Sequence, residues 1–120
     1  MSRRMSCSMT IDAVRARTKT VTRRHVDTWT TLKPGDRLTL IEKGMGLPKG
    51  AHQVVLAHVE IVDVRVESIG DIIVEPFGTA REGLDHMGPA DFISFWLHGY
   101  GYRRVFSIDI PCRRIEWRYL

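Results

Sequence analysis

The stretch HQVVLAHVEIVDVRVE, residues 52–67, decides the fold of this chain. Apolar and polar residues alternate along it, which is typical of a β-strand with one buried face. The apolar residues occupy odd positions from Ala57 to Ile61 and even positions from Val62 to Val66. A slip of one residue moves the apolar side chains to the other face, so the sequence predicts a bulge or a sharp bend there. Bends of this kind allow a small sheet to curl into a barrel.

The rest of the chain supplies further strands and short helices. We expect strands at 6–9, 17–24, 37–41, 104–110 and 113–118, and helices at 11–17, 79–84 and 89–98. Pro34 and Gly35 indicate a turn, and Pro89 suits the first position of a helix. The predicted fold class is therefore α+β, a small curled mixed β-sheet or β-barrel with short flanking helices. Its size predicts one domain over residues 1–120.

Composition excludes several classes of protein. No apolar stretch is long enough to span a membrane, and residues 1–10 lack the apolar core of a secretory signal. Cys7 and Cys112 have neither metal-type spacing nor the pattern of a disulfide framework, so we expect reduced thiols in a cytoplasmic protein. The five histidines show no metal-binding spacing either. We therefore expect no metal, no cofactor and no membrane partner.

Positive charge is concentrated at the two ends of the chain. Residues 1–24 hold seven Lys or Arg and one acid, and residues 103–120 hold five Arg and two acids. The segment between them has six Lys or Arg against eleven acids. If the terminal segments lie side by side, they form one basic face of the kind that binds phosphate backbones. The alternative is a charge imbalance that only keeps the chain soluble.

The run RTKTVTRR, residues 17–24, places four cations and three threonines in eight positions. If the run is extended, Arg17, Lys19 and Arg23 share one face. Such a strand either faces a polyanion or lines a polar cleft. The alternative is a solvated edge strand whose charges block aggregation.

Four segments of the chain resemble the ASCH domain family of the PUA-like superfamily. They are SMT at 8–10, KTVTR at 19–23, LKPGD at 32–36, and AREG at 80–83 followed by an aromatic helix. The resemblance covers roughly residues 5–110. It implies a small β-barrel with packed helices, in agreement with the strands expected from the residues. ASCH proteins are associated with RNA, and some are enzymes.

Within this family the chain is similar to the small bacterial N4-acetylcytidine amidohydrolases. The similarity implies three catalytic residues: Lys19 accepts a proton, Thr22 attacks the acetamide carbonyl and Glu82 protonates the leaving amine. A threonine hydroxyl needs such a base, and a lysine serves as one only if its pKa is lowered. In a regular strand Lys19 and Thr22 point to opposite faces, so a bulge or twist near Thr20 is required.

Each of these three residues also has a plainer interpretation. Glu82 would complete a capping box with Thr79, Thr22 would simply favour β-structure, and Lys19 would contact phosphate. For contact with nucleic acid we expect Arg17, Arg23, Arg24, Trp29, Arg103 and Arg104.

Aromatic residues are the expected stacking platforms for a base. Trp29 lies in a polar loop and is the favoured stacking or lid residue, Tyr100 and Tyr102 are further candidates, and Trp96 is expected in the core. The predicted function is binding of RNA or a modified nucleoside, with hydrolysis of N4-acetylcytidine or a related amide as the catalytic hypothesis. The alternatives are a non-catalytic RNA-binding module and an RNA-cleaving relative.

Overall fold

The computed structural model describes residues 3–44, 46–102 and 106–120. Its elements, in chain order, are β1 (Arg3–Ser6), α1 (Ile11–Arg15), β2 (Val21–His25), β3 (Arg37–Ile41), β4 (Val55–Ser68), the 3-10 helix η1 (Ile69–Ile73), α2 (Gly78–Arg81), α3 (Pro89–Gly99) and β5 (Pro111–Tyr119). The strands form one sheet in the order β1-β3-β4-β5-β2. β1 runs parallel to β3, and the other neighbours are antiparallel. The predicted mixed sheet is confirmed.

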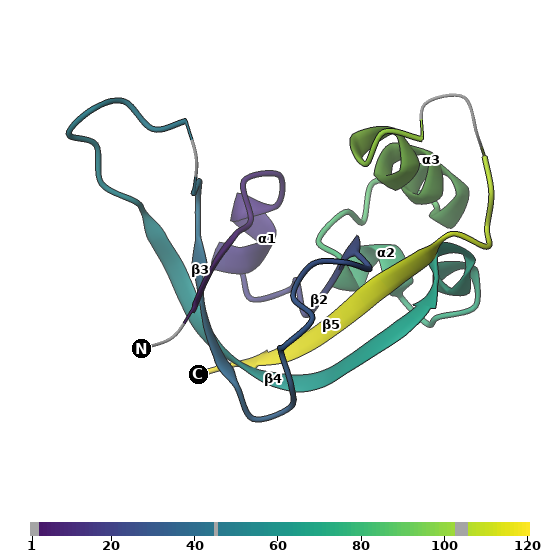
Figure 1. The fold of residues 1–120 in the computed structure, drawn as a ribbon, viewed down its shortest axis with the longest axis horizontal. Helices are drawn as coiled ribbons and strands as arrows, with labels where there is room; N and C mark the ends of the chain where they lie inside the picture. Colours follow the sequence, from purple (N-terminus) through teal and green to yellow (C-terminus); the bar gives the residue numbers. More distant parts are fainter. Residues whose placement is uncertain (1–2, 45, 103–105) are drawn as a thin grey trace.

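The long strand β4 contains the predicted irregularity. Its register with β5 shifts between Ile61 and Asp63, and the intervening Val62 is exposed. Before the shift Val59 and Ile61 are buried, whereas after it Val64 is only partly buried and Val66 is exposed. Figure 1 shows β4 and β5 curving beneath the helices, so that the sheet forms a half-barrel.

Two apolar clusters hold the fold together. The first fills the concave side of the sheet, where Val14 of α1 packs with Leu40 of β3, Val59 of β4 and Trp117 of β5. The second lies under α3 and joins its buried apolar side chains to those of η1 and to Cys112 of β5. α1 and α3 thus lie over different parts of the same sheet (Figure 1). The candidate site is lined by α3 and by the segment that precedes α1.

Several predicted boundaries are corrected by the structure. The strand expected at 17–24 begins only at Val21, because Lys19 N donates to Ala13 O at 3.2 Å and Thr20 N donates to Arg81 O at 2.9 Å. These bonds tie the N–H groups of Lys19 and Thr20 to α1 and α2, whereas Thr20 O still accepts a hydrogen bond from Trp117 N of β5 at 2.9 Å. Arg17, two residues before Lys19, has a left-handed backbone with φ 61°, which ends the helical stretch two residues after Arg15.

Further corrections concern the two ends of the chain. The first strand spans residues 3–6 instead of 6–9. We expected a strand at 104–110, but the structure describes residues 106–110 of this segment and they form no strand. These residues bond to η1 instead, where Gly70 N donates to Ile108 O at 2.9 Å. The prediction that the basic terminal segments are neighbours is confirmed for β2 and β5, which pair antiparallel. In the described part of the chain, no helix has the length and apolar character needed to cross a membrane.

Candidate active site

A cavity of about 380 Å³ opens between the two edges of the half-barrel. Its walls come from the end of β1 and the residues after it, from β2, from the segment after α2 and from α3. Its volume lies within the range typical of small-molecule sites. Lys19, Thr22 and Glu82 all line it. The structure therefore brings together the three residues that the family resemblance singles out.

The irregular backbone before β2 explains how Lys19 and Thr22 reach the same cavity. In a regular strand, residues three apart point to opposite faces. Here Thr20 O accepts a hydrogen bond from Trp117 N at 2.9 Å, and regular pairing of β2 starts with Val21 opposite Glu116. Lys19 therefore lies before the strand, so the alternation of side chains along β2 does not determine the direction of its side chain.

Lys19 is almost fully buried, with 4% of its surface exposed. Its Nζ donates to the backbone oxygen of Glu82 at 2.6 Å and lies 3.7 Å from Glu82 Oε1. Its own backbone oxygen accepts hydrogen bonds from Trp117 Nε1 at 3.0 Å and from the Tyr119 hydroxyl. Burial lowers the pKa of Lys19 from its ordinary 10.5, and the charge of Glu82 opposes this only in part. A lysine in this environment is suited to lose its proton.

Glu82 lies at the C-terminal end of α2 and turns its carboxylate toward two cations. Oε2 accepts a hydrogen bond from Arg23 Nη1 at 2.8 Å, and Oε1 faces Lys19. The capping-box alternative is wrong, because α2 has Phe77 as its N-cap, no side-chain cap bond, and Glu82 at its other end.

Gly83 allows this approach of Glu82 to Lys19. Its φ is +83°, a conformation that favours glycine. A Cβ at this position would stand 2.9 Å from Ala13 Cβ and 3.3 Å from Lys19 Cβ. The absence of a side chain therefore lets the chain after α2 pack directly against α1 and Lys19.

Thr22 is buried at the floor of the cavity. Its Oγ1 accepts a hydrogen bond from Arg24 Nε at 3.0 Å. The same guanidinium donates through Nη2 to the backbone oxygen of Ser6 at 2.8 Å. The hydroxyl thus has a fixed partner from its own strand.

An aromatic wall from α3 faces these polar groups. The rings of Trp96 and Tyr100 lie 4.5 Å apart, and Trp96 Nε1 donates to Arg23 O at 2.9 Å. Phe95 and Tyr100 are exposed at the cavity, whereas Trp96 is buried as predicted. A partly exposed aromatic ring opposite polar groups suits a nucleobase. Sequence reasoning missed Phe95, although aromatic residues at 92, 96 and 100 repeat with helical spacing along this face.

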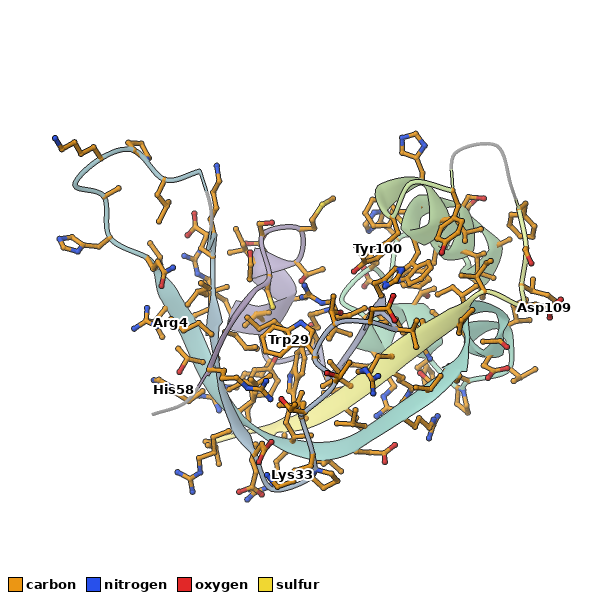
Figure 2. The ribbon with its side chains drawn as sticks, in the orientation of Figure 1. Arg4, Trp29, Lys33, His58, Tyr100 and Asp109 are labelled. Carbon is orange, nitrogen blue, oxygen red and sulfur yellow. The ribbon has the colours of Figure 1, made fainter. Side chains whose placement is uncertain are left out.

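Trp29 does not line the cavity. It is half-buried against the first apolar cluster, and the Arg3 guanidinium lies 5.3 Å from its ring. Figure 2 shows Trp29 over the sheet and Tyr100 at the end of α3. The expectation that Trp29 covers or stacks on a ligand at this cleft is therefore corrected: of these two residues, only Tyr100 lines the cavity.

The arginines expected to contact nucleic acid have diverse environments. Arg23 has no exposed side-chain surface and is ion-paired with three carboxylates. The expectation that it contacts a phosphate is therefore corrected, because its charge is buried and compensated within the protein. Arg17 is exposed, with its guanidinium 5.6 Å from the ring centre of Tyr119. Arg24 bonds within the cavity as described, and Arg103 and Arg104 lie outside the described residues.

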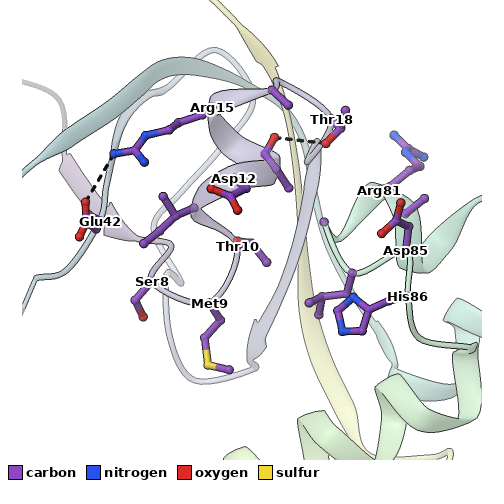
Figure 3. A pocket seen from close by; sticks show the side chains of 16 residues that line it. Ser8, Met9, Thr10, Asp12, Arg15, Thr18, Glu42, Arg81, Asp85 and His86 are labelled. Carbon is purple, nitrogen blue, oxygen red and sulfur yellow. Dashed lines mark hydrogen bonds and ion pairs between the residues drawn. The ribbon is translucent and has the colours of Figure 1, made fainter.

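A wider groove of about 950 Å³ adjoins the cavity, between α1 and the segment after α2 (Figure 3). Arg15 on its wall is ion-paired with Glu42 at 3.6 Å, and Asp12 and Asp85 add negative charge. Mixed charge of this kind does not favour a phosphate backbone. Among the described residues, no group of three or more His, Cys, Asp or Glu side chains could hold a metal ion.

The structure is similar to two solved structures. One is a protein from Enterococcus faecalis V583 described by the family model DUF984, with a TM-score of 0.61 and 16% identity over 100% of this chain and 76% of that chain. The other is an ASCH domain from Lactobacillus crispatus JV V101, with a TM-score of 0.50 and 14% identity over 92% of this chain and 70% of that chain. No protein-family model and no curated protein matches the sequence. The chain therefore shares its fold with an ASCH domain, as expected.

Proposed function

We propose that this chain binds a cytidine-like nucleoside in the cavity and hydrolyses the amide bond of an acyl group on N4 of the base. The observation that supports this best is the convergence of Lys19, Thr22 and Glu82 on one cavity of nucleoside size, opposite an aromatic wall. A nucleophile, a buried base and a carboxylate in one cleft are the parts that acyl transfer needs.

The reaction would begin when Thr22 Oγ1 attacks the acyl carbonyl carbon as Lys19 Nζ takes the hydroxyl proton. Burial of Lys19 favours its neutral form, which is the form that can accept this proton. When the tetrahedral intermediate collapses, the bond from carbon to N4 breaks. N4 then takes a proton from the Lys19–Glu82 pair, whose Nζ and Oε1 are 3.7 Å apart. Water hydrolyses the acyl ester on Thr22, which releases the carboxylic acid and restores the hydroxyl.

A second candidate is a non-catalytic module that binds RNA or a modified nucleoside. One observation favours it: Lys19 Nζ is engaged by Glu82, and Thr22 Oγ1 is engaged by Arg24, in place of a bond between lysine and threonine. The same cavity and the same aromatic wall would then serve recognition alone. Tyr100 would supply the stacking surface under either proposal.

One experiment separates the two candidates. The wild-type chain is incubated with a series of N4-acylated cytidines and with a structured RNA, and deacylation and strand cleavage are read together. Deacylation of the nucleosides supports the hydrolase, and strand cleavage would support an RNA-cleaving activity. If neither product forms while cytidine binds, and Tyr100→Ala weakens that binding by roughly tenfold, the binding module is correct.

A further inference from the structure

Arg24 connects the two open edges of the sheet at the cavity. β1 and β2 are the edge strands, and Arg24 of β2 donates to the backbone oxygen of Ser6, the last residue of β1, at 2.8 Å. The same edge of the guanidinium donates from Nε to Thr22 Oγ1 at 3.0 Å. Residues two apart in a strand share a face, so β2 itself places Arg24 beside Thr22.

This pair of bonds fixes how the Thr22 hydroxyl can act. A hydroxyl oxygen has two lone pairs and one proton. Because Arg24 Nε–H occupies one lone pair, the hydroxyl proton points away from Arg24. A guanidinium at this position also stabilises negative charge on Oγ1 as the proton leaves, because hydrogen bonds to an ionised partner are stronger. Arg24 can therefore both orient and activate the hydroxyl.

We infer that Arg24 is the positioning residue of the site: its guanidinium, anchored on the Ser6 carbonyl, holds the Thr22 hydroxyl in the orientation required for attack. This inference rests on the proposed hydrolase function. A lysine could not replace Arg24, because an ammonium is a point donor without the planar fork that spans both acceptors. The bond to Ser6 matters because it fixes the fork from the other edge of the sheet.

The test compares Arg24→Lys with Arg113→Lys in the deacylation assay. Arg113 also makes an arginine–carbonyl bond, from Nη2 to Val26 O at 2.8 Å, but it does not contact Thr22. We expect Arg24→Lys to lower kcat by about 10²-fold with little change in KM, because misplacement of a reacting group acts on the chemical step. Arg113→Lys should retain wild-type kcat. Methylguanidinium added to Arg24→Ala should restore part of the lost rate, which a purely structural role would not allow.

A double-variant comparison tests whether Arg24 acts through Thr22. In the background of Thr22→Val, Arg24→Lys should cause no further loss of rate, because residues that act as a unit are not additive. An equal loss in both backgrounds would overturn the inference, as would wild-type kcat in Arg24→Lys. If the wild-type chain shows no turnover on any acylcytidine, the proposed function itself fails, and this inference fails with it. The results therefore distinguish failure of the inference alone from failure of both.

Discussion

Arg23 of β2 and Arg114 of β5 lie directly opposite each other in the sheet, and both side chains are buried. Two like charges in this arrangement repel each other unless carboxylates compensate them. Glu75 Oε1 does so for both, accepting from Arg23 at 3.0 Å and from Arg114 at 2.7 Å. Arg23 also holds Glu82. The carboxylate of the candidate site is therefore tied to the ion network that stabilises the sheet.

Glu75→Gln should destabilise the fold. Replacing Glu75 leaves two buried guanidinium groups short of compensating charge, and breaking a buried ion pair from one side costs about 3 kcal/mol or more. Denaturant unfolding of the variant measures this loss. Glu60→Gln is the control, since Glu60 pairs with the exposed Arg118 and a surface pair contributes about 1 kcal/mol or less. Equal stability of the two variants would contradict the role assigned to Glu75.

The stability of the protein should fall in acid through the same residue. Burial alone would raise the pKa of Glu75, but the hydrogen bond from Arg114 and the charge of Arg23 hold it below the ordinary 4.5. Below 4.5 the unfolded chain binds a proton that the folded protein still excludes, so the contribution of Glu75 is lost as pH falls through its folded pKa. Melts of wild type and Glu75→Gln between neutral pH and about pH 3 should therefore converge in acid. A stability difference independent of pH would contradict this explanation.

Lys19→Met should remove activity and leave the fold intact. The lowered pKa of Lys19 means that its contribution to stability is present above 10.5 and is lost as pH falls through its folded pKa. At neutral pH the buried lysine therefore brings little net stability through its charge. Lys19→Met leaves Glu82 paired with Arg23 but removes the Nζ hydrogen bond to the Glu82 carbonyl, so we expect the free energy of unfolding to fall by about 1–3 kcal/mol. In the wild type, kcat/KM should rise with pH along a limb centred below 10.5, where Lys19 loses its proton. An active but clearly destabilised Lys19→Met would show that the lysine is structural.

The curvature of the sheet could be predicted from sequence because burial of one face imposes a period of two. The change of phase between Ile61 and Val62 indicated the irregularity in β4 that the structure places there. The extent of β2 could not be predicted in this way. Its first expected residues bond to Ala13 and Arg81, and these tertiary partners override the β-propensity of the threonines.

The environment of Arg23 could not be predicted from sequence either. It depends on carboxylates 44, 52 and 59 positions away, which the fold alone brings together. Local sequence showed only a cation in a basic run, which is why Arg23 was expected at the surface. The grouping of Lys19, Thr22 and Glu82 was available through the family resemblance and not through spacing. In contrast, the helical repeat that carries Trp96 and Tyr100 was visible in the sequence.

Thr22→Val and Glu82→Gln together decide between an enzyme and a binding module. Valine keeps the shape and β-propensity of Thr22 and removes only the hydroxyl. Glutamine keeps the size of Glu82 and its ability to accept a hydrogen bond from Arg23 Nη1, but removes the negative charge that faces Lys19. We expect each variant to lose turnover on the best acylcytidine by orders of magnitude, while its affinity for cytidine changes only modestly. The reason is that both groups act mainly in the transition state.

The measurements are steady-state kinetics and calorimetric titration with cytidine, with Thr20→Val as the matched control for Thr22→Val. Thr20 makes its side-chain hydrogen bond with Arg81 and is not among the residues that line the cavity. Thr20→Val should therefore keep wild-type turnover, since it removes a hydroxyl two residues away without touching the cavity. Wild-type turnover in both Thr22→Val and Glu82→Gln would show that the catalytic roles implied by the family resemblance do not apply to this chain. Loss of affinity together with turnover would instead place both residues in ground-state binding, because uniform binding and transition-state binding separate in KM and kcat.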